Sequence, residues 1–418
     1  MNQKTLLVLG AATCAAVALT AALQSSRADE TRPAGTDGRL LPALEGRVND
    51  VRQILIEGAA GAATLKATDA GWVLAEASDY PADDAKVRTL LLDLRDARRI
   101  EAKTANPDRH GRLGLVAPDA EGASSTRVTL SDGSGAPIEA LLIGKQRTSR
   151  AEPNAAQLGV TPGAQYYAMP NGGPQTFLAS GNLRVDARAL GWVNQEFLNV
   201  DRARIAAATI THPDGEVVDA VREDMSANEM VVRNVPEGMV AKTPSGTAQL
   251  VGALQRVRFD DVRAAGSMEW PEDALTTASF TTEDGLRIDV ETLQAAAEDD
   301  PSRMVTWARV RAGLVPEEPA EPVEAAGDDG SEGAAPQEGP TRAELQAEVD
   351  GILAAVDGWA YALPGWKESS LRLRMDAVAE TPAEEATPAP GAEPQVPLAP
   401  TPIQLTPPPA TEGSGGGI

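Results

Sequence analysis

The histidines are the first residues to consider for chemistry, because imidazole binds metals and transfers protons near neutral pH. His110 and His212 are the only two in the chain, and they stand about a hundred residues apart. A zinc site needs several His, Cys or carboxylate ligands that come together, and neither histidine stands in such a cluster. We therefore expect both to be loop histidines exposed to solvent.

Three pairs of adjacent carboxylates could contact a divalent cation. They are Asp83–Asp84, Asp260–Asp261 and Asp299–Asp300. None is accompanied by the ligand spacing of a calcium loop, and helix capping and solvation account for all three. A Gly-rich phosphate loop before a helix and a Gly-x-Ser-x-Gly turn are also missing from the sequence. The sequence thus predicts no metal-binding residue and no cofactor.

Aromatic side chains offer the remaining chemistry, since a flat ring can stack on a sugar or a peptide. Trp72, Trp192 and Trp307 could form such a face. Their positions in predicted strands and in a linking segment favour burial in the core. We therefore predict no catalytic residue and no enzymatic activity.

The elements around these residues form a pattern that occurs twice. In residues 51–203, two or three short strands precede an amphipathic helix in which Val87, Leu90, Leu91 and Leu94 follow the i, i+3, i+4, i+7 spacing. Asp79 or Asp83 would cap this helix, which Pro81 would open. A second hairpin, a third strand and a bridge follow. The segment is predicted to be an antiparallel sheet with one packed helix.

Residues 204–315 repeat this order more weakly. Strands are expected over 205–211, 217–221 and 230–233, and a helix after Thr243 and Pro244 with Leu250, Leu254 and Val257 on its buried face. A hairpin and a third strand follow again. The predicted fold class is α+β with two tandem repeats, so that residues 51–170 and 204–310 should superpose.

The remaining segments differ in composition. Residues 316–340 are rich in Pro, Glu, Ala and Gly, and residues 380–418 form a Pro-rich tail, so both are predicted to be disordered. Between them, residues 341–379 open with a capping box at Thr341 and Glu344 and should form the helical closing segment of the second repeat. A compact aromatic turn is expected over 358–366.

The N-terminal segment 1–24 determines the expected location. Lys4 precedes an apolar run from Leu6 to Leu23 that is just long enough to cross a bilayer. The segment is either a single-pass signal anchor or a cleaved signal peptide, and the length of the run favours the anchor. Cys14, the only cysteine, fits a lipid-facing thiol better than a lipoprotein site. Residues 25–50 would be a polar tether, with the bulk of the chain periplasmic.

Composition limits the partners. The 418 residues carry a formal net charge of −24, which disfavours binding to nucleic acid and to anionic headgroups. The hydrophobic content of 42% is enough for a folded core, although aromatic residues make up only 3%. We expect a folded acidic protein that contacts the membrane through its N-terminal helix alone.

Two passages resemble a known family when taken with the predicted anchor. They are Gly-Trp-Val-Leu … Tyr-Pro-Ala-Asp-Asp-Ala-Lys-Val-Arg-Thr-Leu-Leu at 71–91 and Asp-Gly-Trp-Ala-Tyr-Ala-Leu-Pro at 357–364. The chain is similar to a bacterial membrane-anchored domain-of-unknown-function family often encoded beside gliding-motility-type ABC transporter genes. The resemblance implies no catalytic residues. It implies a non-enzymatic accessory or scaffold module of an export-type transporter in the inner membrane, with a cell-envelope polymer-binding module or an envelope hydrolase as alternatives.

Overall fold

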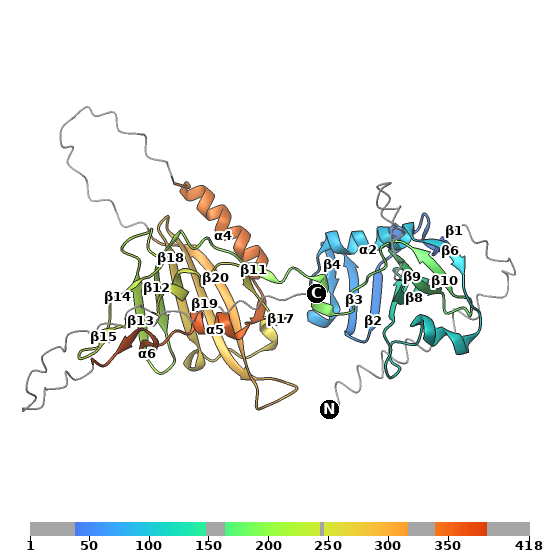
Figure 1. The fold of residues 1–418 in the computed structure, drawn as a ribbon. Helices are drawn as coiled ribbons and strands as arrows, with labels where there is room; N and C mark the ends of the chain where they lie inside the picture. Colours follow the sequence, from blue (N-terminus) through green and yellow to red (C-terminus); the bar gives the residue numbers. More distant parts are fainter. Residues whose placement is uncertain (1–37, 148–163, 243–245, 317–338, 383–418) are drawn as a thin grey trace, which may run out of the picture. The chain divides into compact units, whose positions relative to one another are not determined.

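A computed structural model describes residues 38–147, 164–242, 246–316 and 339–382. They form two large antiparallel sheets with few helices, which is the α+β class expected from the sequence (Figure 1). The predicted membrane anchor at 1–24 lies outside these residues, as do most of the Pro-rich insert and the tail. Within the described ranges, no helix combines the length and the hydropathy needed to cross a bilayer.

The first sheet has ten strands. They are β1 (Gly38–Arg39), β2 (Gln53–Gly58), β3 (Gly61–Thr68), β4 (Gly71–Leu74), β5 (Tyr80–Pro81), β6 (Arg98–Ala102), β7 (Thr126–Ser131), β8 (Pro137–Gln146), β9 (Gln165–Pro170) and β10 (Phe177–Ser180). Their order in the sheet is β1-β6-β10-β9-β8-β7-β2-β3-β4-β5. In β2, Ile54 and Ile56 are fully buried, as the period of two in a strand requires. The hydrophobic alternation therefore fixes which face of the sheet meets the core.

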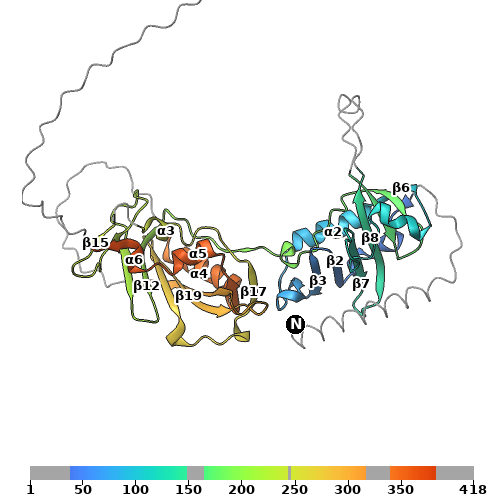
Figure 2. The same cartoon turned by 60° about the horizontal axis from the view of Figure 1, so that its bottom comes forward.

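Helix α2 (Asp84–Asp96) packs on this sheet, as Figures 1 and 2 show. Its buried residues are Val87, Leu90, Leu91 and Leu94, the four predicted from their spacing. The Asp83 carboxylate accepts hydrogen bonds from the backbone N–H groups of residues 85 and 86 and so caps the helix. Pro81 does not open the helix, because it pairs with Val73 in β5.

The tether predicted for residues 25–50 is too long. Leu40, Leu41 and Leu44 are all 1% exposed or less, so residues from 38 onward belong to the fold. Two short 3-10 turns, Pro42–Leu44 and Val48–Asp50, carry the chain to β2. Three leucines within five residues can bury enough apolar surface to hold a short segment against a sheet.

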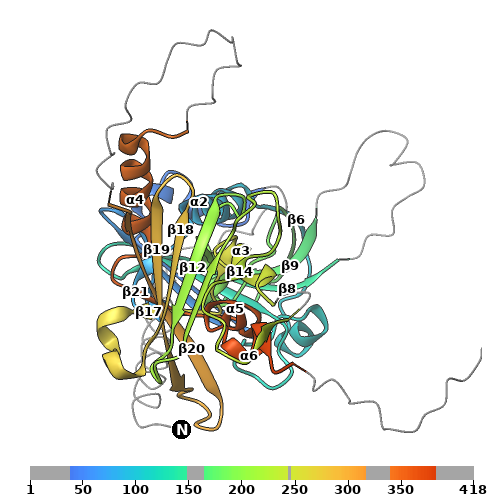
Figure 3. The same ribbon diagram turned by 90° about the vertical axis from the view of Figure 1, so that its left-hand side faces the viewer.

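The second sheet has eight strands (Figure 3). They are β12 (Ile205–Thr211), β13 (Val217–Val221), β14 (Val231–Val232), β17 (Asp261–Ala264), β18 (Thr276–Thr282), β19 (Leu286–Ala296), β20 (Met304–Leu314) and β21 (Trp359–Ala362). The order in the sheet is β14-β13-β12-β18-β19-β20-β21-β17. Two small ribbons accompany it: β11 (Glu196–Leu198) with β16 (Val257–Arg258), and β15 (Val240–Ala241) with β22 (Ala379–Glu380).

The two large sheets share one strand order. From β6 to β4 the first sheet reads β6-β10-β9-β8-β7-β2-β3-β4, and the second reads β17-β21-β20-β19-β18-β12-β13-β14. Strands at equal places in these two rows also follow one another in the same order along the chain. The main differences are the strands β1 and β5 at the edges of the first sheet and the long connection between β20 and β21.

The helix expected after Pro244 is much shorter than predicted. Residues 243–245 lie outside the described ranges, and α3 spans only Ala248–Val251. Leu250, Leu254 and Val257 are buried as expected, but Val257 belongs to strand β16 rather than to the helix. Gly252 ends the helix after one turn, which is consistent with the low helix propensity of glycine.

One helix directly precedes strand β21 (Trp359–Ala362) along the chain, and two follow it. They are α4 (Arg342–Val356), α5 (Gly365–Leu371) and α6 (Met375–Val378). The capping box of Thr341 and Glu344 is formed, and Leu345 and Val349 of α4 are buried beside β20. The aromatic turn predicted over 358–366 is wrong, because residues 359–362 form strand β21 between β20 and β17.

Truncation of Leu94 to alanine should destabilise the protein strongly. Its side chain is fully buried between α2 and the first sheet, so Leu94→Ala should lower the free energy of unfolding by about 2–5 kcal/mol. Leu92 lies on the same helix and is 38% exposed, so Leu92→Ala serves as the matched control with a clearly smaller loss. Urea unfolding followed by circular dichroism measures both. Equal losses would contradict the packing of this helix.

Candidate functional site

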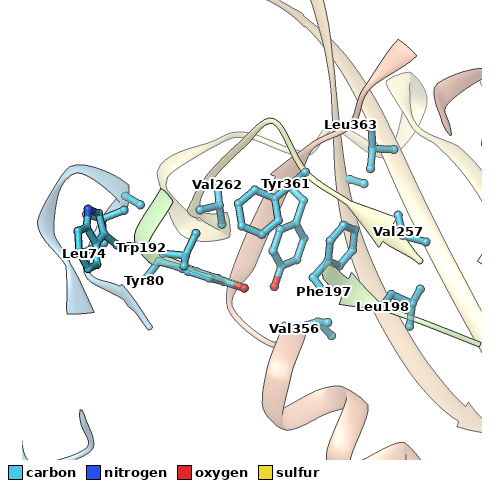
Figure 4. Packing of buried hydrophobic residues seen from close by; sticks show 14 of the residues in the cluster. Leu74, Tyr80, Trp192, Phe197, Leu198, Val257, Val262, Val356, Tyr361 and Leu363 are labelled. Carbon is cyan, nitrogen blue, oxygen red and sulfur yellow. The ribbon is translucent and has the colours of Figure 1, made fainter. Parts of the chain in front are cut away.

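The two passages that carry the family resemblance meet in one aromatic cluster. Tyr80, from the first passage, packs edge-to-face on Trp359 and Tyr361, from the second, with ring centroids 4.8 Å and 6.3 Å away. Phe197 stacks on Tyr361 at 3.9 Å (Figure 4). Phe259 lies 5.4 Å from Tyr361, ring centroid to ring centroid, and completes the cluster. These motifs are therefore neighbours in space although nearly 280 residues separate them in the chain.

The backbone before Tyr80 is unusual and presents its ring to the cluster. Ser78 and Asp79 both have positive φ, 59° and 62°, a conformation that costs energy for residues other than glycine. Tyr80 then pairs with Leu74 in β5 and is 7% exposed. The packing of the Tyr80 ring in the core offsets the conformational strain of the Ser78–Asp79 turn.

Burial also determines the protonation state of the Tyr80 and Tyr361 hydroxyl groups. It raises the pKa of Tyr80 and of Tyr361 above the usual value. The Tyr361 hydroxyl donates to the backbone oxygen of Ala355 at 3.2 Å, and Figure 4 shows the two hydroxyls pointing toward each other. Both groups stay protonated at neutral pH, so the cluster is suited to holding segments together and lacks a phenolate base.

The expectation that both histidines are exposed is wrong. His110 is 9% exposed and His212 is 3% exposed. The His110 ring nitrogen Nε2 lies 3.0 Å from the carbonyl oxygen of Pro174. In His212, Nε2 lies 3.1 Å from the carbonyl oxygen of Leu373 and Nδ1 lies 3.3 Å from Oγ1 of Thr276. Each imidazole thus joins its own turn to a distant segment of backbone.

Lys367 is a buried cation that no pattern in the sequence indicated. It is 2% exposed, and its Nζ donates to the carbonyl oxygens of Gly252, Ala253 and Gln255 at 2.9, 2.7 and 2.9 Å. These carbonyls follow the single turn of α3 and give the ammonium three acceptors. Burial lowers the pKa of Lys367 to about 8. The ammonium fixes α5 to the end of α3.

Glu139 is the corresponding buried anion in the first sheet. It is 1% exposed, accepts from the backbone N–H of Ala43 at 2.7 Å, and accepts from the side-chain amide of Asn171 at 2.6 Å. Burial raises the pKa of this carboxyl group. One carboxylate oxygen therefore attaches the N-terminal segment to strand β8, and the other binds the residue that follows β9.

Two of the three carboxylate pairs serve local structure, and the third, Asp260–Asp261, lies in a groove beside Trp307. Asp83 caps α2, and Asp84 accepts from the backbone N–H of Trp72 at 2.9 Å. Asp299 pairs with Arg303 at 2.7 Å. Asp300 accepts the backbone N–H of residue 302 in a tight turn. Within the described ranges, no three His, Cys, Asp or Glu side chains come together in an arrangement that could hold a metal ion.

The tryptophans expected in the core are mostly there. Trp192 and Trp307 are 6% and 4% exposed, and Trp72 is half-buried. Trp307 lines a groove of about 680 Å³ on the second sheet, but the guanidinium of Arg263 lies over its ring at 3.9 Å. A stacking face for a sugar would need that arginine to move. Trp366, by contrast, is 62% exposed.

The buried lysine predicts an unusual dependence of stability on pH. The pKa of Lys367 is about 8 in the folded protein and about 10.4 when unfolded. Between these values the unfolded chain binds more protons, so stability rises with pH. The free energy of unfolding should increase from pH 8 to pH 10 by up to about 1.4 kcal/mol per pH unit relative to Lys367→Met.

Urea titrations of both proteins at each pH measure this difference. The two buried tyrosines have raised pKa values and lower stability above pH 10, but they contribute equally to both proteins and cancel. Parallel profiles of wild type and Lys367→Met from pH 8 to pH 10 would contradict a depressed pKa for this lysine.

Comparison with known proteins gives a family without an assigned activity. No curated protein and no solved structure was found to be similar to the chain. The family match begins in strand β4, inside the first resemblance passage, and ends in strand β18. It therefore leaves out strands β1 to β3 and the second passage. Residues 72–279, roughly half of the chain, match the family model described as a domain of unknown function, DUF4340.

Proposed function

We propose that the chain is a non-enzymatic, membrane-anchored periplasmic module that acts by binding other proteins. The observation that carries this proposal is the set of hydrogen bonds made by the buried titratable side chains. His110, His212, Lys367 and Glu139 are buried, and each is hydrogen-bonded to backbone groups of another segment. Side chains engaged in this way stabilise a scaffold and are poorly placed to attack or protonate a substrate.

The shared strand order supports an internal duplication as the origin of this scaffold. Eight strands recur in one order in both sheets and along the chain. A duplication explains why α2 and α3 hold equal places before β6 and β17, although α3 has only four residues. Under this duplication, the long connection between β20 and β21, which contains the Pro-rich insert and α4, was added to the second copy alone.

The proposed membrane anchor at 1–24 would hold the first sheet close to the bilayer. The first described strand is β1, which begins with Gly38, so the linker in this proposal would be residues 25–37. Thirteen residues span at most about 45 Å when fully extended. That length suits a module whose partner is itself embedded in the inner membrane.

The partner we propose is a component of an export-type ABC transporter or gliding-motility-type complex. The support is the resemblance of the two passages to a family encoded beside such transporters. Trp366 offers a contact point, since it is the most exposed large apolar side chain among the described residues at 62%. Exposed tryptophans are enriched among residues that dominate binding energy at interfaces.

Binding of a cell-envelope polymer is the second candidate. The groove beside Trp307 contains Met268 and carboxylates from β17, from the β19–β20 connection and from α5, and its volume of about 680 Å³ is in the range of ligand sites. Arg263 covers the Trp307 ring, which weakens this candidate. An envelope hydrolase receives less support, because Asp261 and Glu298 in the groove are exposed and pair with Arg263.

The predicted topology can be tested with reporter fusions. If residues 1–24 cross the membrane with the N-terminus inside, alkaline phosphatase fused after residue 380 should be active. A cytoplasmic reporter such as β-galactosidase at the same point should be inactive. The reverse pattern would remove the periplasmic location.

The proposed partner can be identified by crosslinking in native membranes. A photoreactive amino acid in place of Trp366 should give adducts with an integral membrane subunit of a transporter, identified by mass spectrometry. The same amino acid in place of Arg188, whose side chain is 72% exposed, is the control and should give few such adducts. Equal labelling from both positions, or adducts without any transporter subunit, would argue against the proposed association.

A further inference from the structure

An open pocket, called the cavity below, lies where the C-terminal helical segment meets the second sheet. Its volume is about 450 Å³, and its walls include His212, Gln294, Glu368, Arg372 and Arg374. This volume is within the range of sites that hold small molecules or a single side chain of a partner. Two of these five residues are arginines, in a chain whose formal net charge is −24.

Arg372 has hydrogen-bonding capacity that the fold leaves unused. Its Nη1 donates to Oγ1 of Thr292 at 3.0 Å and to the Thr292 carbonyl oxygen at 3.4 Å. Its Nε and Nη2 have no acceptor in the described part of the chain. They are reached by solvent, because Arg99 Nε is the one buried side-chain nitrogen or oxygen there without a partner. The Nε–Nη2 edge of a guanidinium is one of its bidentate edges for a carboxylate or phosphate.

The neighbouring groups do not satisfy this edge. Arg374 pairs with Asp214 at 2.8 Å and with Glu216 at 3.2 Å. The Glu368 carboxylate accepts from the side-chain amide of Gln294 at 2.6 Å and makes no ion pair with Arg372. Burial lowers the pKa of Arg372, yet an arginine remains charged at neutral pH. A fixed cation with a free edge therefore lines a cavity of ligand size.

We propose that this cavity binds an oxyanion, the carboxylate or phosphate group of a ligand, on the Nε–Nη2 edge of Arg372. Thr292 holds Nη1 from β19, so the fork is oriented before the ligand arrives, which reduces the entropy lost on binding. Glu368 opposes the anion and limits its affinity. The site does not depend on the transporter association, because it requires only the groups in this cavity.

Isothermal titration calorimetry on the purified full-length chain tests the site with two probes, succinate and inorganic phosphate. We expect saturable binding at one site per chain. A response to succinate alone identifies a carboxylate ligand, and a response to phosphate alone identifies a phosphate ligand. Arg372→Gln should weaken binding at least about tenfold, since it removes a charge-assisted bidentate contact. No saturable binding of either anion would overturn the proposal.

Three further variants separate recognition from folding. Arg372→Lys keeps the charge without the fork, so it should fold and still bind about tenfold more weakly. Glu368→Gln should bind more tightly than wild type, because it removes an opposing charge. Arg188→Gln, at an exposed arginine, should change nothing. Unchanged affinity in both Arg372 variants, with the fold confirmed by circular dichroism, would show that Arg372 serves only to hold Thr292.

Discussion

The pairing of strand β21 is the constraint on which the second half of the structure depends. Residues 359–362 pair with β17 on one side, Asp261 opposite Ala362, and with β20 on the other, Trp307 opposite Ala362. Without this strand, β17 would have no partner in the sheet. Alternation along β21 sends Tyr361 into the aromatic cluster and its alanines to the face of Trp307. A strand of four residues thus determines two packing surfaces.

The residues that follow β21 are fixed by polar contacts to chain segments far away in sequence. Lys367 fixes α5 to the end of α3, His212 reaches the carbonyl oxygen of Leu373, and Glu216 accepts from the backbone N–H of Met375. These contacts bury charge and hydrogen-bonding groups, which costs free energy unless every group is satisfied. These contacts therefore specify where the segment after β21 lies, since only one position of the segment satisfies all of them.

Local patterns predicted what local physics determines. The spacing of Val87, Leu90, Leu91 and Leu94 identified the buried face of α2, and the Thr341 capping box marked the start of α4. The patterns failed where distant segments decide. Residues 359–362 form a strand because two neighbours pair with them. His212 is buried because residues 371–378 cover its turn, and nothing near His212 in the sequence signals that cover.

The dependence on distant segments also explains why no sequence motif predicted the cavity at Arg372. Its walls come from the β12–β13 turn, from β19 and from α5 with the residues after it, so the cavity exists only when the C-terminal segment is in place. An anion bound there would stabilise the folded position of the C-terminal segment, by an amount that grows with the logarithm of the anion concentration above the dissociation constant. Occupancy of the cavity and attachment of α5 are then one linked equilibrium. Since Trp366 also belongs to α5, a partner contacting that tryptophan and a ligand on Arg372 would favour the same position of one helix.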